Sequence, residues 1–231
     1  MAKKPVVAKK NTSEIALCYV ALTYGLVLLL VLISEAVRDV GNVRMFTNWT
    51  NFMCSVWMIL YAISFFCKGK KLENFIRNKN LLISLVSYAT ITFTIVVLVL
   101  FPIYSGELIS GMNGSTFFTH FLTIVIMWII YAQMRLTGKF NAKTNCWVLT
   151  FPFVWAGIVI LIGILTNDQN FIPYNFLKPN WYIDAHGTLV GWLMFGSVIA
   201  GLAGTFYGLG FAFIALKKKT NLATGTNTTI W

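Results

Sequence analysis

Six long apolar stretches constrain this chain more than any other feature of its sequence. They are residues 15–37, 46–67, 81–104, 116–134, 146–166 and 187–216. A helix needs about 20 apolar residues to cross a hydrocarbon core of roughly 30 Å, and each stretch is close to or above that length. No stretch shows the alternating pattern of about ten residues that is typical of a transmembrane β-strand. The sequence therefore predicts an all-α, polytopic membrane protein with six transmembrane helices in one bundle.

The composition excludes several other classes of protein. Of the 231 residues, 58% are hydrophobic and only 11% are charged, whereas an ordinary soluble domain has about 25% charged residues. The mean hydropathy is +0.74. A water-soluble monomer of this size has too much surface to hide so much apolar area. We therefore exclude a soluble enzyme, a disordered tail and a disulfide scaffold.

The basic residues are distributed unevenly around the six stretches. Fifteen of the 18 Lys and Arg residues lie before the first stretch, after the sixth, or in the second and fourth connections. The opposite side has only Arg38, Arg44 and Lys178. The positive-inside rule then predicts a cell-membrane protein with both termini in the cytoplasm. On this interpretation the net charge of +11 is a topology signal. We expect membrane lipids as partners and no nucleic acid.

The same pattern predicts a simple domain organisation. We expect a basic cytoplasmic N-terminus over residues 1–14, a transmembrane domain over 15–216, and a polar cytoplasmic tail over 217–231. The first stretch has no cleavage site after it and is expected to be retained. The four cysteines show no metal-ligand spacing and are expected to pack as small hydrophobic residues. We expect no cofactor and no metal site.

Two of the predicted helices carry polar stripes near their first turns. The second stretch has one at i, i+3, i+4, i+7 and i+8, which places its members on one helix face: Thr47, Thr50, Asn51, Cys54 and Ser55. The fourth has a similar one: Thr116, Thr119, His120 and Thr123. Such stripes either form interhelical hydrogen bonds or, around an ionisable residue such as His120, mark a functional site.

Apart from the fifteen Lys and Arg residues on the cytoplasmic side, the predicted topology brings most ionisable residues to one membrane face, the outer one. They are Glu35, Glu107, His120, Asp184 and His186. Structural roles are the alternative for several of them. Asp184 would then be the N-cap of the sixth helix, where a carboxylate is favoured by the free N–H groups and the helix dipole.

Glycine and proline add local expectations. Gly187 and Gly191, and likewise Gly204 and Gly208, form small-xxx-small pairs, which permit close approach between helices. We expect Gly204 and Gly208 to permit contact with a helical partner. Pro152 in the fifth stretch predicts either a kink or an early helix boundary.

Three short segments resemble one known family. They are residues 46–51 (FTNWTN), 118–121 (FTHF) and 171–177 (FIPYNFL). Their layout resembles the androgen-induced-gene / androgen-dependent TFPI-regulating protein family and its bacterial relatives, which are six-helix membrane proteins. In the family a proline often follows the histidine, with an acidic residue further along the helix. Here no proline follows, and the nearest comparable polar residue is Gln133.

The resemblance implies a chemistry. The animal members of that family are threonine hydrolases that cleave fatty-acid esters of hydroxy fatty acids, with an essential threonine in the second helix and an essential histidine in the fourth. It implies Thr47 as the nucleophile, His120 as its base and a lipid-like substrate. A threonine hydroxyl is inert until a neighbouring group accepts its proton, and a neutral imidazole is suited to that role. A third group commonly orients the histidine.

The sequence does not identify the residue that would orient His120. Asn51, Asp184 and Glu35 are the candidates, and His186 is a supporting or alternative site residue. Two other functions also stay open. A small-solute transporter would show inverted repeats and charges near the membrane midplane. A non-enzymatic scaffold would use its glycine-rich sixth helix to bind a partner.

Overall fold

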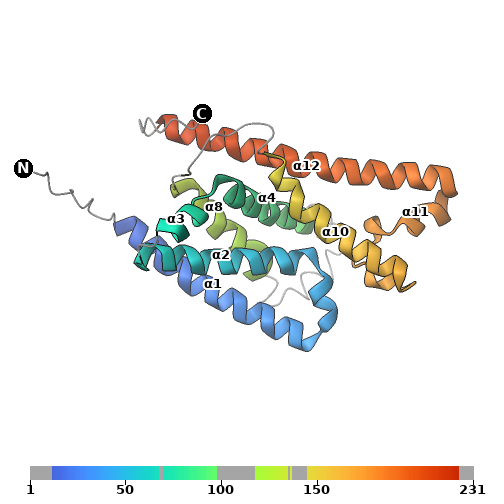
Figure 1. Ribbon diagram of the computed structural model, residues 1–231, viewed down its shortest axis with the longest axis horizontal. Coiled ribbons are helices and arrows are strands. Elements are labelled where there is room, and N and C mark those ends of the chain that lie inside the picture. Colours follow the sequence, from blue (N-terminus) through green and yellow to red (C-terminus); the bar gives the residue numbers. More distant parts are fainter. Residues whose placement is uncertain (1–11, 68–69, 98–117, 135, 137–144, 224–231) are drawn as a thin grey trace, which may run out of the picture.

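The computed structural model describes residues 12–67, 70–97, 118–134, 136 and 145–223. The regular elements in these ranges are helices, which confirms the all-α prediction (Figure 1). The longer ones are α1 (Thr12–Arg38), α2 (Phe46–Cys67), α4 (Lys79–Ile95), α8 (Thr123–Gln133), α10 (Trp147–Leu165) and α12 (Thr188–Ala223). The shorter ones are η1 (Val40–Arg44), α3 (Lys70–Ile76), η3 (Phe118–Leu122), η4 (Gln169–Phe171), η5 (Asn175–Leu177) and α11 (Pro179–His186).

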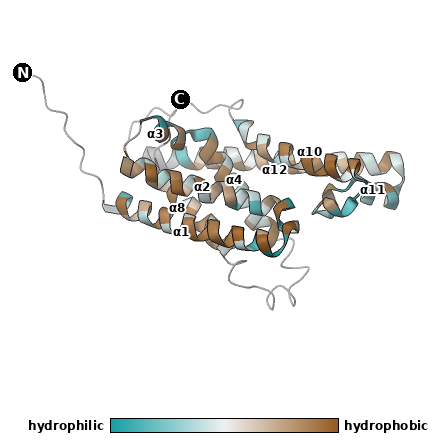
Figure 2. Cartoon of the chain, turned by 60° about the horizontal axis from the view of Figure 1, so that its bottom comes forward, coloured by the Kyte–Doolittle hydropathy of each residue, from teal (hydrophilic) through white to brown (hydrophobic). Residues whose placement is uncertain are grey.

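Four of the described helices are long and apolar enough to cross a membrane: α1, α2, α10 and α12. They coincide with the first, second, fifth and sixth predicted stretches. The other two stretches are represented by shorter apolar helices, over Lys79–Ile95 and Thr119–Gln133. Parts of both predicted stretches lie outside the described residues. Figure 2 shows hydrophobic residues along most of the length of α1 and α2.

The first two long helices form a hairpin. Gly25 of α1 lies so close to α2 that an added Cβ would be 3.0 Å from the main-chain oxygen of Ser55. The hairpin turns through η1, whose first N–H groups are capped by Asp39. The indole of Trp49 and the amide of Asn48 donate hydrogen bonds to main-chain oxygens of this turn. The beginning of α2 is therefore fixed to the turn before it.

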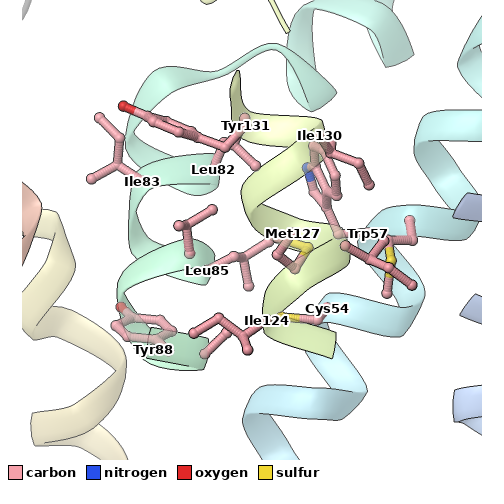
Figure 3. Close-up of a cluster of buried hydrophobic side chains, with 14 of the residues drawn as sticks. Cys54, Trp57, Leu82, Ile83, Leu85, Tyr88, Ile124, Met127, Ile130 and Tyr131 are labelled. Carbon is pink, nitrogen blue, oxygen red and sulfur yellow. The ribbon is translucent and has the colours of Figure 1, made fainter. Parts of the chain in front are cut away.

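The helix α4 forms the centre of the core. Every residue from Leu82 to Thr92 is buried, which is expected of a helix that is packed on all sides. Figure 3 shows side chains from α2, α4 and α8 meeting in one cluster, among them Trp57, Leu85 and Met127. α4 therefore contacts α2 and α8 as well as α10 and α12, and it positions these helices relative to one another.

The last part of the chain folds back on itself. Gly187 has a φ of +79°, a conformation that favours glycine, and it separates α11 from α12. An added Cβ on Gly191 would lie 2.6 Å from the Cα of Ile183, so α11 and α12 pack with almost no space between them. Of the predicted pair, Gly191 therefore makes a close approach, whereas an added Cβ at Gly187 would meet nothing within 4 Å. Asp184 lies inside α11, so the prediction that it caps the sixth helix is wrong.

Two helices continue past a point where the sequence allowed an end. Pro152 lies inside α10, which continues to Leu165, so of its two alternatives the early boundary is not seen. Pro152 is in the second turn of α10, where few intrahelical hydrogen bonds are lost. The sixth predicted stretch ends at Leu216, close to Lys218, where the apolar part of α12 ends, and the helix itself runs on to Ala223. One reason is that Lys217 is only 1% exposed and is held by α8.

Candidate functional site

Thr47 lies in the first turn of α2, and its position depends on the residue before it. The Phe46 ring is buried against several other rings, with centroid distances that include 5.1 Å to Trp155, 5.5 Å to Phe151 and 5.9 Å to Phe206. These partners belong to α10 and α12. The sequence feature that fixes Thr47 is therefore an aromatic residue at the first position of the helix, which packs the beginning of α2 against two distant helices.

His120 lies in η3, a single π-helical turn that precedes α8. π-helical turns are rare in proteins, and those that occur are often found at functional sites. The turn is fixed to α4, because the rings of Phe121 and Phe93 pack edge to face at 5.3 Å. The Nδ1 atom of His120 is buried and has no hydrogen-bond partner among the described residues. One ring nitrogen is therefore free to receive or hold a proton.

Thr47 and His120 line the same partly open cavity, which has a volume of about 120 Å³. The sequence predicted the two residues as a pair, and the fold brings them to one place. Most of the wall is apolar and comes from α4, α10, η5 and α12: Ile91, Ile95, Val96, Pro152, Phe153, Ala156, Phe176, Leu177, Ile199, Leu202 and Ala203. Among the described residues that line it there is no Asp, Glu, Lys or Arg.

The cavity is deeper in the fold than the sequence suggested. Thr47 lies in the first turn of α2 and His120 in the turn before α8, but they share the cavity with Ile199 and Phe206, which lie well inside α12. The offset arises because α10, α11 and α12 extend beyond the end of α2 at which Thr47 lies (Figure 1). A position at the end of one helix is therefore level with the middle of another.

Tyr174 is a cavity residue that was not selected as a site residue. It follows Pro173 in the connection between α10 and α11. Its hydroxyl oxygen lies 3.5 Å from the Oγ1 of Thr47, at the long limit for a hydrogen bond. The sequence signal for Tyr174 is its place within the FIPYNFL segment.

The remaining predicted site residues do not line this cavity. Asn51 is buried one turn after Thr47, and its Nδ2 has no hydrogen-bond partner among the described residues. Asp184 and His186 are exposed on α11, and Glu35 is half-buried near the end of α1. Glu107 lies outside the described residues.

The polar stripes face the protein interior. On α2, Thr50, Asn51, Cys54 and Ser55 are all buried. On the fourth stretch Thr119 and Thr123 are buried, and the hydroxyls of Thr123 and Tyr24 are 2.8 Å apart, which links α8 to α1. Thr116 lies outside the described residues. These stripes therefore include interhelical contacts as well as the two cavity residues.

The glycine pairs of α12 differ from each other. Gly191 is in tight contact with α11, whereas an added Cβ at Gly204 or Gly208 would meet nothing within 4 Å. The contact between these two glycines and a partner stays a prediction. In the described ranges, no group of three or more His, Cys, Asp or Glu side chains is arranged to hold a metal ion.

The arrangement combines a hydroxyl, an imidazole with a free nitrogen and a phenol in an apolar cavity. Apolar walls with a few polar groups are typical of small-molecule sites. A hydroxyl beside a proton acceptor is the minimum for nucleophilic catalysis. No protein-family model matches the chain, and the searches of curated proteins and of solved structures found no match either.

Proposed function

We propose that this protein is an intramembrane hydrolase of fatty-acyl esters, with Thr47 as nucleophile and His120 as base. The observation that carries the proposal is that these two residues, chosen from the sequence, line one apolar cavity. The resemblance to the androgen-induced-gene / androgen-dependent TFPI-regulating protein family supports the same pair. The cavity also suits the ester class, because apolar walls contact the methylenes while the polar groups face the ester.

The reaction would proceed through an acyl-threonine. The Thr47 hydroxyl gives its proton to the imidazole of His120 while its oxygen forms a bond to the ester carbon. The tetrahedral intermediate then expels the alcohol, which takes the proton from His120. Water, activated by the same imidazole, releases the fatty acid and restores Thr47. Both partners of the pair are expected to be necessary.

The test uses the full chain, purified in detergent or nanodiscs, with a fatty-acid ester of a hydroxy fatty acid. Thr47→Ala and His120→Ala are expected to lower kcat/KM by at least about 100-fold, the usual scale for a nucleophile or base. Thr47→Ser should keep measurable activity because it keeps the hydroxyl. Full activity in both alanine variants would exclude the catalytic assignment.

A matched control is available in the same cavity. Thr92 also lines it, but its hydroxyl already donates to the main-chain oxygen of Tyr88, 2.9 Å away. Thr92→Ala therefore removes a cavity hydroxyl of the same chemical type without removing a free nucleophile. We expect its kcat/KM to stay within a few-fold of the wild-type value.

We also propose the full topology of six spans with both termini in the cytoplasm of a cell membrane. The four long apolar helices and the two shorter ones support six spans, and the distribution of Lys and Arg supports the orientation. Reporter fusions after Lys79, Lys143 and Lys219 should all be cytoplasmic, whereas fusions after Gly41 and Asn113 should be extracytoplasmic. A reversed pattern would contradict the orientation.

A further inference from the structure

The polar groups of the cavity are few, and one of them has no part in the reaction described above. The polar side chains that line it include Thr47, Thr92, His120 and Tyr174. Thr92 is occupied by a main-chain oxygen of its own helix. The Tyr174 hydroxyl has its hydrogen-bond contact with the proposed nucleophile itself. It is therefore the group to examine for a further role.

The ring of Tyr174 is held firmly. It stacks on Phe176, with a centroid distance of 5.3 Å and an angle of 14°, and tilts against Trp155 at 5.9 Å. The flanking residues Ile172 and Leu177 are 1% and 2% exposed. The hydroxyl is thus positioned by the packing of its ring and of the chain on either side, so it does not depend on Thr47 for its place.

We infer that Tyr174 is a third catalytic residue of this site, whose hydroxyl donates a hydrogen bond to the ester carbonyl oxygen as Thr47 attacks. The inference rests on the proposed function. When the Thr47 oxygen bonds to the carbonyl carbon, the carbonyl oxygen lies next to that bond. A donor 3.5 Å from the Thr47 oxygen can then reach the developing oxyanion, for which the effective distance is about 2.7–3.1 Å.

The balance of protons is simple. The Thr47 proton goes to His120, the carbonyl electron pair moves onto the oxygen, and Tyr174 keeps its own proton throughout. Burial raises the pKa of the Tyr174 hydroxyl above its ordinary value of 10.0, and hydrogen bonds from Thr47 and from the main-chain N–H groups of Thr47 and Phe46 oppose only part of that rise. The phenol is therefore protonated at neutral pH and available as a donor.

The test is Tyr174→Phe in the full chain, which keeps the ring and its stacking and removes only the hydroxyl. We expect kcat/KM on an oxoester to fall by about 100- to 1,000-fold, the usual loss for one oxyanion donor. The matched control is Tyr182→Phe, because the Tyr182 hydroxyl donates to the main-chain oxygen of Phe176 and does not line the cavity. It should keep wild-type activity.

A thionoester distinguishes an oxyanion donor from a merely structural residue. Sulfur accepts hydrogen bonds weakly, so removal of the donor should affect the thionoester less than the oxoester, and the ratio of their rates should fall by about tenfold or more in Tyr174→Phe. An equal loss on both esters would indicate a structural role and overturn the inference. Wild-type activity in Tyr174→Phe, with Thr47→Ala inactive, would overturn this inference and leave the proposed function standing.

A second measurement does not need turnover. A long-chain ketone is not hydrolysed, and its carbonyl stretch moves to lower wavenumber when it accepts a hydrogen bond. With the wild-type protein we expect that displacement, and with Tyr174→Phe we expect most of it to disappear. The same stretch in both proteins, or no protein-dependent displacement at all, would overturn the inference. If the wild-type protein displaces the ketone stretch but does not hydrolyse the ester, the proposed hydrolysis is overturned and the hydrogen bond from Tyr174 to a carbonyl stands.

Discussion

Tyr131 and Lys217 hold α8 and α12 together through main-chain atoms in both directions. The Lys217 ammonium donates hydrogen bonds to the main-chain oxygens of Tyr131, 2.6 Å away, and Ala132, 2.9 Å away. It also lies 5.2 Å from the centre of the Tyr131 ring. The Tyr131 hydroxyl in turn donates to the main-chain oxygen of Phe213 at 2.5 Å. Lys217, one of the fifteen basic residues on the predicted cytoplasmic side, is therefore also a buried structural residue.

Lys217→Met should lower the free energy of unfolding. The carbonyl groups in the last turn of α8 have no intrahelical partners, and the ammonium satisfies two of them. Removing the ammonium leaves the main-chain oxygens of Tyr131 and Ala132 without this donor. One buried acceptor left unpaired lowers the free energy of unfolding by about 1–3 kcal/mol. The measurement is unfolding of the purified protein in mixed micelles. Lys218→Met is the control, because the neighbouring Lys218 is exposed. Equal stability of the two variants would contradict the proposed role of Lys217.

Gly191→Ala should destabilise the protein. The new methyl group would lie 2.6 Å from the Cα of Ile183 and 2.7 Å from its nitrogen, and main-chain atoms cannot rotate away. Overpacking of this kind typically costs about 1–3 kcal/mol. Thermal unfolding of the purified chain would measure it.

Gly196→Ala supplies the matched control on the same helix. An added Cβ there would meet nothing within 4 Å, and alanine is a better helix former than glycine by up to about 1 kcal/mol. We expect unchanged or slightly raised stability. If Gly191→Ala were as stable as Gly196→Ala, the tight contact between α11 and α12 would be refuted.

Arg44→Ala should reduce ester hydrolysis without touching the cavity. Arg44 donates to the main-chain oxygen of Asn170 at 2.7 Å, and its guanidinium lies 5.4 Å from the centre of the Phe171 ring. These contacts join the last residue of η1, two positions before α2 begins, to the segment that carries Tyr174. A displacement of about 1 Å of a positioning residue can cost about 100-fold in rate, so we expect a loss of about tenfold in kcat, measured by steady-state kinetics.

Arg38→Ala is the comparison for that variant. It removes an arginine from the last turn of α1, where the side chain is exposed. Its effect on activity should be less than twofold. Equal losses in the two arginine variants would point to a general effect of charge and not to the position of Tyr174.

A double-mutant cycle on Tyr24→Phe and Thr123→Val should show coupling between α1 and α8. The two hydroxyls are 2.8 Å apart and buried. Interhelical hydrogen bonds in membrane proteins have coupling energies of about 0.6 kcal/mol on average, with a maximum of about 1.7. Unfolding free energies of the two single variants and the double variant give the value. Additive effects would show that the contact contributes nothing.

Much of this fold is predictable because the signals are local. The apolar stretches predict the helices and the ends of several of them, such as Phe46 and Cys67 of α2, since a run of about 20 apolar residues has few other stable forms. The spacing of Gly187 and Gly191 predicts a close contact that only Gly191 makes. Asp184 shows the limit of that approach, because a cap and a mid-helix residue differ only in where the chain turns, and Gly187 decides that.

The candidate site was predictable in part. His120 stands out in the sequence because an ionisable residue inside an apolar stretch is uncommon, and the family resemblance of residues 46–51 and 118–121 pairs it with Thr47. Tyr174 does not stand out, because it lies in a connection with ordinary composition, and only packing of its ring against Trp155 and Phe176 brings its hydroxyl to Thr47. The edge-to-face packing of Phe46 against α10 and α12 cannot be predicted from the sequence either, since its partners are over 100 residues away along the chain.

The sequence by itself determined that this chain is helical and apolar enough for a membrane, and which few polar residues its helices carry. The physical reason is that these properties depend on length, composition and spacing, which are local. The tertiary structure decided which of those residues share a cavity, that Tyr174 joins Thr47 there, and that Lys217 is buried. The cavity outcomes depend on the offset between α10–α12 and the beginning of α2, and the burial of Lys217 depends on the contact of α12 with α8. Both are set by packing between segments that are distant in the sequence.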